Sequence, residues 1–261
     1  MVSAADRAKS PTKTSVWLEN KAERGRRPGA GQPDGLDRDK IIDATVRLLD
    51  AEGAAKFSMR KLAAELNVTA MSLYWYVDTK DDLLELALDS VFGTFTLPEV
   101  GTGGAADWRD QLRALASGYR ALLVRHPWVS ALIGTFLNIG PHSMAFSHAV
   151  QKVIRDTGLP PDGQMGGLAA VFQFVYGFGT IEGHFVQRCA SAGLSQDEYF
   201  RQAMGTISEQ PEFKKDFEHA TELMEARGGE TVEEMRERDF AFALDLLVAG
   251  IEAMVERSAR T

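Results

Sequence analysis

Residues 57–84 read FSMRKLAAELNVTAMSLYWYVDTKDDLL, and this stretch decides how the chain folds. Ser58, Thr69 and Thr79 each precede a run of apolar residues at helical spacing, which is where helix N-caps are found. Asn67 ends the first run, and asparagine tolerates the left-handed backbone conformation that stops a helix. The stretch therefore predicts two short helices and a longer one, over about 59–66, 70–76 and 80–94.

The same helical spacing continues on both sides of this stretch. Upstream, Asp37 is a plausible cap for a helix that runs to about Glu52. Downstream, the helical runs are interrupted by Gly and Pro, and no segment alternates like a β-strand. We therefore expect an all-α fold. Its further helices are predicted over 107–126, 128–139, 143–156, 162–190, within 195–230, and from Thr231 to near the C-terminus.

The first three predicted helices have the order of a helix-turn-helix: a support helix, a positioning helix, a tight turn and a recognition helix. This order divides the chain into three parts. Residues 1–34 lack apolar periodicity and read as a disordered basic arm, with local structure expected only around 16–18. Residues 35–95 form the DNA-binding domain with its connector helix, and residues 96–261 form a helical ligand-binding and dimerisation domain.

Composition constrains the class of protein. The 261 residues carry a formal net charge of -8, which argues against a uniformly basic nucleic-acid binder. The arm nevertheless holds seven basic and four acidic residues, so positive charge is unevenly spread. Cys189 is the only cysteine, which excludes an intramolecular disulfide. No signal peptide or segment long enough to span a bilayer is recognised, so we expect a cytoplasmic protein with no membrane partner.

The predicted helix-turn-helix carries side chains suited to DNA where a duplex would lie. The positioning helix begins with a serine and two cations, beside backbone N–H groups that can hold a phosphate. The recognition helix has short side chains at its leading end, and tyrosines that can reach the DNA backbone. We expect Trp75 to pack in the core. The DNA-contact candidates are Ser58, Arg60, Lys61, Thr69, Ala70, Met71, Ser72, Tyr74, Tyr76 and Lys80.

These residues carry a resemblance to a known family. The matching segments are 39–44 (DKIIDA), 48–53 (LLDAEG), 57–68 (FSMRKLAAELNV), 72–77 (SLYWYV) and 80–84 (KDDLL). Together they resemble the DNA-binding domain of the TetR family, and the SLYWYV segment is similar to the tetracycline-repressor-like subgroup.

The resemblance implies a homodimer that binds a palindromic double-stranded operator and leaves it when a small-molecule effector enters the C-terminal domain. It also implies phosphate contacts from Ser58, Arg60, Tyr74, Tyr76 and Lys80, and base contacts from Ala70, Met71 and Ser72. The chain departs from the subgroup at Ala70, Met71 and Tyr76, so the operator sequence does not transfer.

The C-terminal half holds more aromatic and sulfur-bearing side chains than packing requires, with polar groups interleaved. Apolar walls with a few polar groups are typical of a drug-sized ligand site. Leu132 aligns with the histidine through which the subgroup binds a drug–magnesium chelate, so we expect neither a metal nor a cofactor. The effector-contact candidates are Trp128, Leu132, Phe136, Asn138, His142, Phe146, Phe172, Tyr176, Phe178 and His184.

An enzyme, an architectural DNA binder and an activator are the alternatives to a repressor. An enzyme would need a nucleophile with an orienting base, or a metal cluster, and no such motif is recognised. An architectural DNA binder would not need an aromatic-rich C-terminal half. An activator remains an alternative, because the sequence of a DNA-binding regulator does not show whether it activates or represses transcription. For a repressor, effector binding would move the connector helix and change the distance between the two recognition helices, which DNA requires to be about 34 Å.

Overall fold

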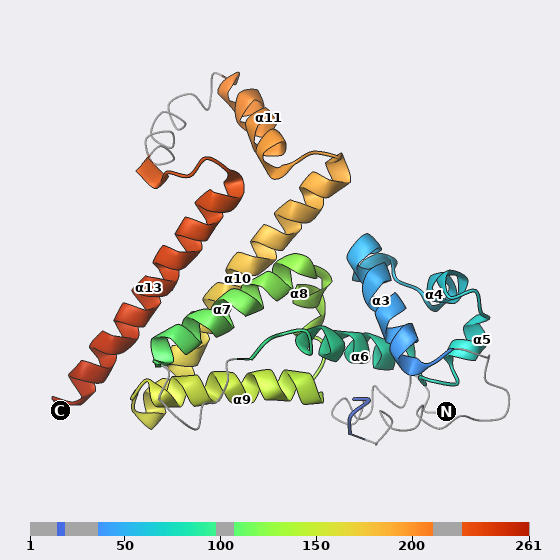
Figure 1. Ribbon diagram of the computed structural model, residues 1–261, viewed down its shortest axis with the longest axis horizontal. Coiled ribbons are helices and arrows are strands. Elements are labelled where there is room, and N and C mark those ends of the chain that lie inside the picture. Colours follow the sequence, from blue (N-terminus) through green and yellow to red (C-terminus); the bar gives the residue numbers. More distant parts are fainter. Residues whose placement is uncertain (1–14, 19–35, 98–106, 211–225, 261) are drawn as a thin grey trace. The chain divides into compact units, whose positions relative to one another are not determined.

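The computed structural model describes residues 15–18, 36–97, 107–210 and 226–260. Within these ranges all regular structure is helical, which confirms the predicted all-α class (Figure 1). The chain forms two compact units. The first contains residues 1–100 and 121–151, and the second contains residues 101–120 and 152–261.

The first unit begins with the helix-turn-helix. Its helices are α3 (Arg38–Glu52), the short 3-10 turn η2 (Ala54–Lys56), α4 (Met59–Glu65), α5 (Ala70–Leu73) and α6 (Lys80–Phe92). The predicted caps are confirmed, since the side chains of Asp37, Ser58, Thr69 and Thr79 each accept a backbone N–H in the first turn. Asn67 has the positive φ of 53° that ends α4.

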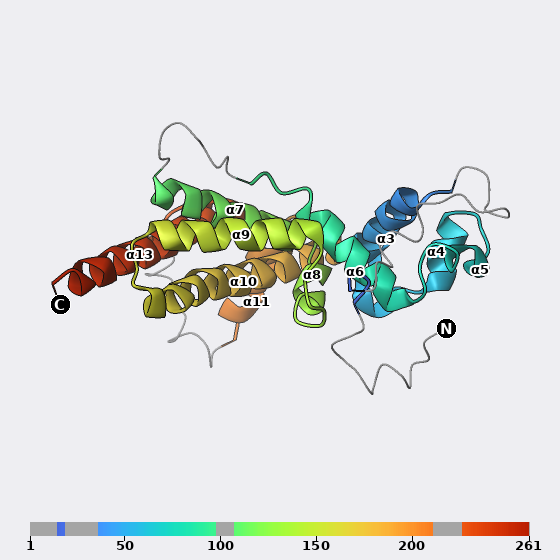
Figure 2. The same ribbon diagram turned by 90° about the horizontal axis from the view of Figure 1, so that it is seen from below.

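The core of the first unit lies between α3 and α6. Ile41 and Leu49 of α3 are fully buried, as are Leu83 and Ala87 of α6. α3 packs on α4 and α6, and α4 and α5 lie together (Figures 1 and 2). Leu62 of α4 is equally buried, so the short helices are held by tertiary packing rather than by their own length.

α6 is buried on more than one side, as expected for a connector. Besides α3, it contacts α8 (Trp128–Leu132). The segment that follows α8 is not helical to residue 139 as predicted, because Asn138 takes a positive φ of 52° and its side-chain amide donates to the carbonyls of Ile133 and Phe136. These bonds close a turn that a continuous helix could not form.

The recognition helix is also shorter than predicted. α5 ends at Leu73, and residues 74–76 continue as a turn. Of the predicted arm, the turn at 15–18 is described and confirms the local structure expected around 16–18. The rest of the arm lies outside the described residues.

The second unit is built on two long helices, α10 (Pro161–Ala192) and α13 (Val232–Ser258), which pack on each other and on α11 (Gln196–Ser208). Two further helices, α7 (Trp108–Arg125) and α9 (Pro141–Asp156), begin in one unit and end in the other. Part of the predicted 195–230 segment, residues 211–225, lies outside the described residues.

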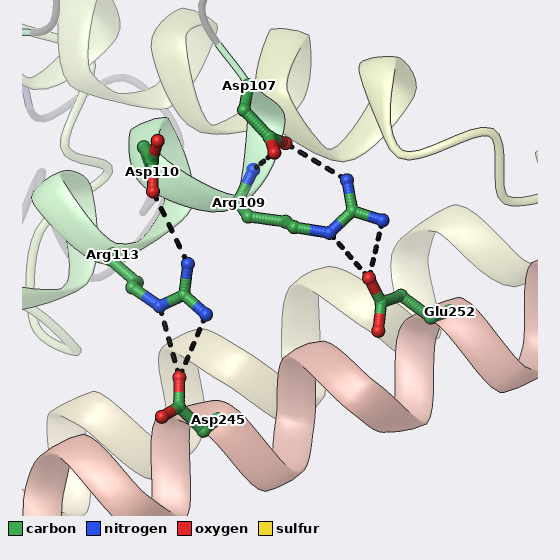
Figure 3. Close-up of polar contacts among 6 residues, drawn as sticks. All are labelled: Asp107, Arg109, Asp110, Arg113, Asp245 and Glu252. Atoms are coloured by element: carbon green, nitrogen blue, oxygen red, sulfur yellow. Dashed lines mark hydrogen bonds and ion pairs between the residues drawn. The ribbon is translucent and has the colours of Figure 1, made fainter.

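Ion pairs join the start of α7 to α13. Arg113 bonds Asp245 at 2.9 and 3.1 Å, and Arg109 bonds Glu252 about two turns further along α13 (Figure 3). Asp107 caps and pairs with Arg109, while Asp110 pairs with Arg113. Because these ion pairs are exposed, they add little to the free energy of folding. Their main effect is to set which residues of α7 face which residues of α13.

Within the described ranges, no helix combines the length and the apolar character needed to cross a lipid bilayer.

Candidate functional site

The recognition helix presents a surface of large side chains to solvent. Thr69 caps α5 through the backbone N–H of Ser72, and Leu73 anchors the helix in the core. Opposite that anchor, Met71 is 70% exposed. The turn after α5 continues this surface with Tyr74. An exposed methionine and tyrosine on a short, capped helix can contact thymine methyl groups and the DNA backbone.

Trp75 extends the same surface, contrary to the expectation that it packs in the core. Its side chain is 64% exposed. Leu73, Tyr76 and Val77 occupy the inward positions of this segment, which leaves the two residues between them facing outward. The spacing of those three apolar residues was the signal in the sequence that could have placed Trp75 correctly.

The start of α4 carries three of the predicted DNA-contact residues. Ser58 accepts the backbone N–H of Lys61 and leaves its hydroxyl able to donate to a phosphate. Arg60 is exposed. Lys61 is exposed too, but its ammonium pairs with Glu52 at the end of α3. We call the exposed side chains of Arg60, Met71, Tyr74 and Trp75 the recognition surface.

Tyr76 does not belong to this surface, and its predicted phosphate contact is wrong. Its side chain is 4% exposed, and its hydroxyl donates to the carbonyl of Leu36 at 2.7 Å. Burial, and to a lesser extent the charge of Asp37, raise the pKa of this phenol. Tyr76 therefore ties the end of the recognition segment to the start of α3.

Lys80 is held inside the first unit. Its ammonium donates to the backbone carbonyl of Phe57 at 3.0 Å and lies 5.5 Å from the centre of the Phe57 ring. This contact joins the start of α6 to the residue before the N-cap of α4. An ammonium has three donors, so the contact leaves room for the phosphate predicted there, which stays a prediction.

Three carboxylates of the first unit each accept two hydrogen bonds from a segment outside the helix-turn-helix. Asp50 of α3 accepts from the His126 ring at 2.7 Å and from the Trp128 indole N–H at 2.6 Å. The sequence pattern gave no signal for these contacts, since the partners lie 76 and 78 residues away.

The contact with Asp50 uses the only polar side-chain atom of Trp128. Its ring is buried, so the predicted effector contact would be made by the apolar ring alone, and it stays a prediction.

Asp89 of α6 makes the second of these contacts. It accepts the backbone N–H of Ser143 at 2.8 Å and that of His142 at 3.4 Å, in the first turn of α9. A carboxylate at a helix N-terminus is favoured by the free N–H groups and by the helix dipole. Gly140 is required beside it, because a Cβ there would lie 2.3 Å from the Asp89 carboxyl. The third carboxylate is Glu85, one turn earlier on α6, which accepts from Ser15 and Val16.

The remaining effector candidates of the first unit have different environments. Leu132 is buried and Phe136 is half-buried. The Phe146 ring packs against the rings of Phe92 and Phe95, with ring centres 5.6 and 5.2 Å apart. His142 is exposed overall, and one face of its ring lies against Gly93.

The second unit holds the other candidates, all on α10. Phe172 is buried beside Tyr119, and Tyr176 is half-buried. Phe178 packs on Phe240 of α13 at 5.3 Å. His184 is exposed. The structure thus places the ten predicted residues in two groups, one in each unit.

A charge cluster centred on the buried Arg120–Glu182 pair lies against these aromatic rings, and sequence reasoning missed it. Arg120 of α7 binds Glu182 of α10 through two nitrogens, at 2.6 and 2.9 Å, and Glu237 of α13 at 2.6 Å. Its guanidinium also lies over the rings of Phe178 and Phe240. Burial lowers the pKa of Arg120, but Glu182 and Glu237 outweigh burial and raise it. Among the described residues, no three His, Cys, Asp or Glu side chains gather to hold a metal ion.

Two family profiles match the chain. Residues 41–87 match "Bacterial regulatory proteins, tetR family", and residues 98–255 match "Tetracyclin repressor-like, C-terminal domain". An HTH-type transcriptional regulator of Saccharopolyspora erythraea is 40% identical over 67% of this chain and 73% of its own length. The HTH-type transcriptional repressor DrrR1 of Streptomyces coeruleorubidus is 31% identical over 91% of this chain and 85% of its own length.

Solved structures share the fold. The crystal structure of Streptomyces coelicolor ActR in complex with actinorhodin has a TM-score of 0.62 and 24% identity, and the match covers 84% of this chain and 98% of ActR.

Proposed function

Because the chain belongs to the tetR family of bacterial regulatory proteins, we propose that it represses transcription from a palindromic operator and is released by a small, largely apolar or aromatic effector. The matched family and the named relatives are transcriptional regulators, not enzymes. DrrR1, a repressor by its name, supports the sign of regulation. The proposal places the DNA-binding domain at 35–95 and the effector and dimerisation domain at 96–261, in a cytoplasmic protein.

The recognition surface is the observation that carries this proposal. Met71 lies on the four-residue helix α5, which Thr69 caps and Leu73 anchors, and Tyr74 and Trp75 lie in the turn that follows it. Met71, Tyr74 and Trp75 together expose apolar area to water, which is unfavourable in free energy. Such exposed apolar patches mark sites of interaction with a partner. A duplex groove would cover this area, while Arg60 and the Ser58 hydroxyl would hold the flanking phosphates.

A second copy of the chain would cover the other large exposed apolar area. The side chains of α13 that face solvent recur at helical spacing, and we call them the outer stripe: Phe242, Leu246, Ala249, Gly250, Ala253 and Met254. On α10, Met165 and Ile181 are exposed as well. Long helices with such stripes pair as antiparallel or crossed bundles, and a two-fold dimer would present two recognition helices to two half-sites.

The effector is proposed to contact the aromatic side chains of α10, chiefly Phe172, Tyr176 and Phe178. Arg120 and Glu182 beside them would give polar groups that orient a ligand between apolar walls. ActR, which has the same fold, was crystallised with actinorhodin, so that protein accepts a small molecule. Effector binding would act by shifting α6 between positions that favour or oppose operator binding.

The first experiment identifies the operator. The full chain selects duplexes from a random 30-bp pool, and the enriched sequence, here the selected duplex, becomes the probe for all affinity measurements. We expect an inverted repeat whose half-sites lie one helical turn apart. A reporter driven through this sequence separates the alternatives, because a repressor lowers transcription, an activator raises it and an architectural protein leaves it unchanged.

The second experiment tests the recognition surface. Tyr74→Ala should weaken binding of the selected duplex by about tenfold, a loss of one good contact, and leave the dimer intact. Arg60→Ala should reduce the slope of log affinity against log salt by about one, because one phosphate contact is lost. Arg155→Ala, which removes an exposed arginine of α9, is the matched control and should leave the slope unchanged. Unaltered affinity in Tyr74→Ala would refute the assigned surface.

A further inference from the structure

The turn at Ser15–Leu18 lies far from the rest of the first unit in sequence but is part of its core. The Leu18 N–H donates to the Ser15 carbonyl at 3.2 Å and closes the turn. Val16 is 1% exposed, which makes it one of the most deeply buried aliphatic side chains of the chain. Ser15 is buried too, whereas Leu18 points outward. We call residues 15–18 the N-terminal turn.

Glu85 of the connector helix α6 holds this turn with both carboxylate oxygens. The Ser15 hydroxyl donates to Oε1 at 2.6 Å, and the Val16 backbone N–H donates to Oε2 at 2.9 Å. Glu85 is 3% exposed, so the N-terminal turn supplies hydrogen bonds that water would otherwise supply. The two donors come from adjacent residues, so they fix both the position and the direction of the turn on α6.

Two other carboxylates close to Glu85 make its charge costly unless hydrogen-bond donors are present. Asp82 and Asp89 lie three residues before and four residues after it, on the same buried face of α6. Burial raises the pKa of Glu85, the hydrogen bonds from Ser15 and Val16 lower it, and the two aspartates raise it further. A leucine would pack here at less cost than a carboxylate, so the carboxylate points to a directional contact rather than to core filling.

The other two carboxylate contacts have the same form. Asp50 joins α3 to the end of α7 and to α8, and Asp89 joins α6 to the start of α9. Each ties the helix-turn-helix or its connector to a segment outside it. The N-terminal turn is the third such segment.

We propose that Glu85 is a positioning residue that binds the N-terminal turn, and that the bound turn holds α6 in the position that operator binding requires. This inference rests on the proposed function, because the measured effect is on DNA binding. A segment fastened across α6 reduces the number of positions that the helix can occupy. Operator affinity then rises, since less order has to be imposed when DNA binds.

A pair of variants tests the proposal. Val16→Asp puts a carboxylate at the buried position whose backbone N–H binds Glu85, and Leu18→Asp makes the same charge change on the exposed side of the same turn. Val16→Asp should bind the selected duplex about 5- to 10-fold more weakly, in the range usual for coupling between sites, with an unchanged salt slope because no phosphate contact is lost. Leu18→Asp should bind as the unaltered chain does. Ser15→Ala, which removes one of the two donors, should give a smaller loss in the same direction.

Hydrogen exchange at the Val16 amide shows directly whether the turn is bound. This amide should exchange slowly in the unaltered chain and in Leu18→Asp, and quickly in Val16→Asp. Rapid exchange in the unaltered chain overturns the contact with Glu85. Equal operator affinity of the two aspartate variants, with protection lost only in Val16→Asp, overturns its effect on α6. If no duplex is enriched at all, the proposed function fails, while the exchange measurement still reports on the turn.

Discussion

The recognition surface and the outer stripe both expose large apolar side chains, yet their neighbours differ. On the recognition surface, Met71 of the four-residue α5 and Trp75 of the turn after it lie with an arginine of the short α4 and with capping hydroxyls. On the outer stripe, Phe242 and Leu246 are followed by alanine and glycine, on a helix of 27 residues. A short helix with cations suits a groove lined with phosphates, whereas a long stripe with small residues suits another helix at close range.

The comparison shows that exposure of apolar area alone does not identify a partner. What distinguishes the two regions is the polar chemistry beside the apolar residues and the length of the element that carries them. Three predictions test this difference.

The largest effect is expected on the outer stripe. Leu246→Arg should place a charge in the centre of the proposed interface, so the chain should sediment as a monomer. Its affinity for the selected duplex should fall by about 10²- to 10⁴-fold, because the second half-site is no longer bound by a linked copy. Gln202→Arg, on the exposed side of α11, is the control and should remain dimeric. A dimeric Leu246→Arg would show that another surface makes the dimer.

The next effect concerns the inner side of the α10–α13 pair. Arg120→Met leaves Glu182 buried without its partner, since the two side chains are only 10% and 9% exposed. The free energy of unfolding, measured with urea, should fall by about 3–5 kcal/mol. Arg113→Met breaks a pair in which the arginine is 40% exposed and should cost less than about 1 kcal/mol.

The double variant Arg120→Met with Glu182→Leu completes that test. It should recover most of the lost stability, because no charge is then left buried. If the double variant is as unstable as Arg120→Met alone, the packing of Arg120 on Phe178 and Phe240 matters more than its charge.

The smallest effect separates the two tyrosines next to Trp75. Tyr76→Phe removes the bond to the Leu36 carbonyl and should lower the free energy of unfolding by about 1 kcal/mol. Binding of the selected duplex should be unaltered, unlike that of Tyr74→Ala. Loss of DNA affinity in Tyr76→Phe at unchanged stability would return Tyr76 to the recognition surface.

Local sequence signals predicted most of the fold. Caps such as Ser58 and Thr79 act within one helical turn, so the spacing of a few residues was enough to find them. The same holds for the positive φ of Asn67. For Tyr76, a contact distant in sequence overturned the prediction. Tyr76 was expected to face DNA because its own neighbours suggest it, but its hydroxyl meets Leu36, 40 residues away.

The candidate site was predicted in the same uneven way. Arg60, Met71 and Tyr74 were expected on the DNA-facing side, and the structure exposes them. Trp128 is expected to contact an effector, and its bond to Asp50, 78 residues away, was not foreseen. The buried Arg120–Glu182 pair joins residues 62 positions apart, and neither residue is unusual for its own helix.

The amino-acid sequence by itself determined the helices, their caps, the helix-turn-helix and the family, because each of these depends on residues close together in the chain. The tertiary structure alone decided which polar side chains are turned inward. Glu85, Asp89 and Arg120 look like ordinary surface charges in a helical pattern. They are buried because donors or carboxylates from distant segments meet them, and a charge leaves water only where such partners replace its hydration.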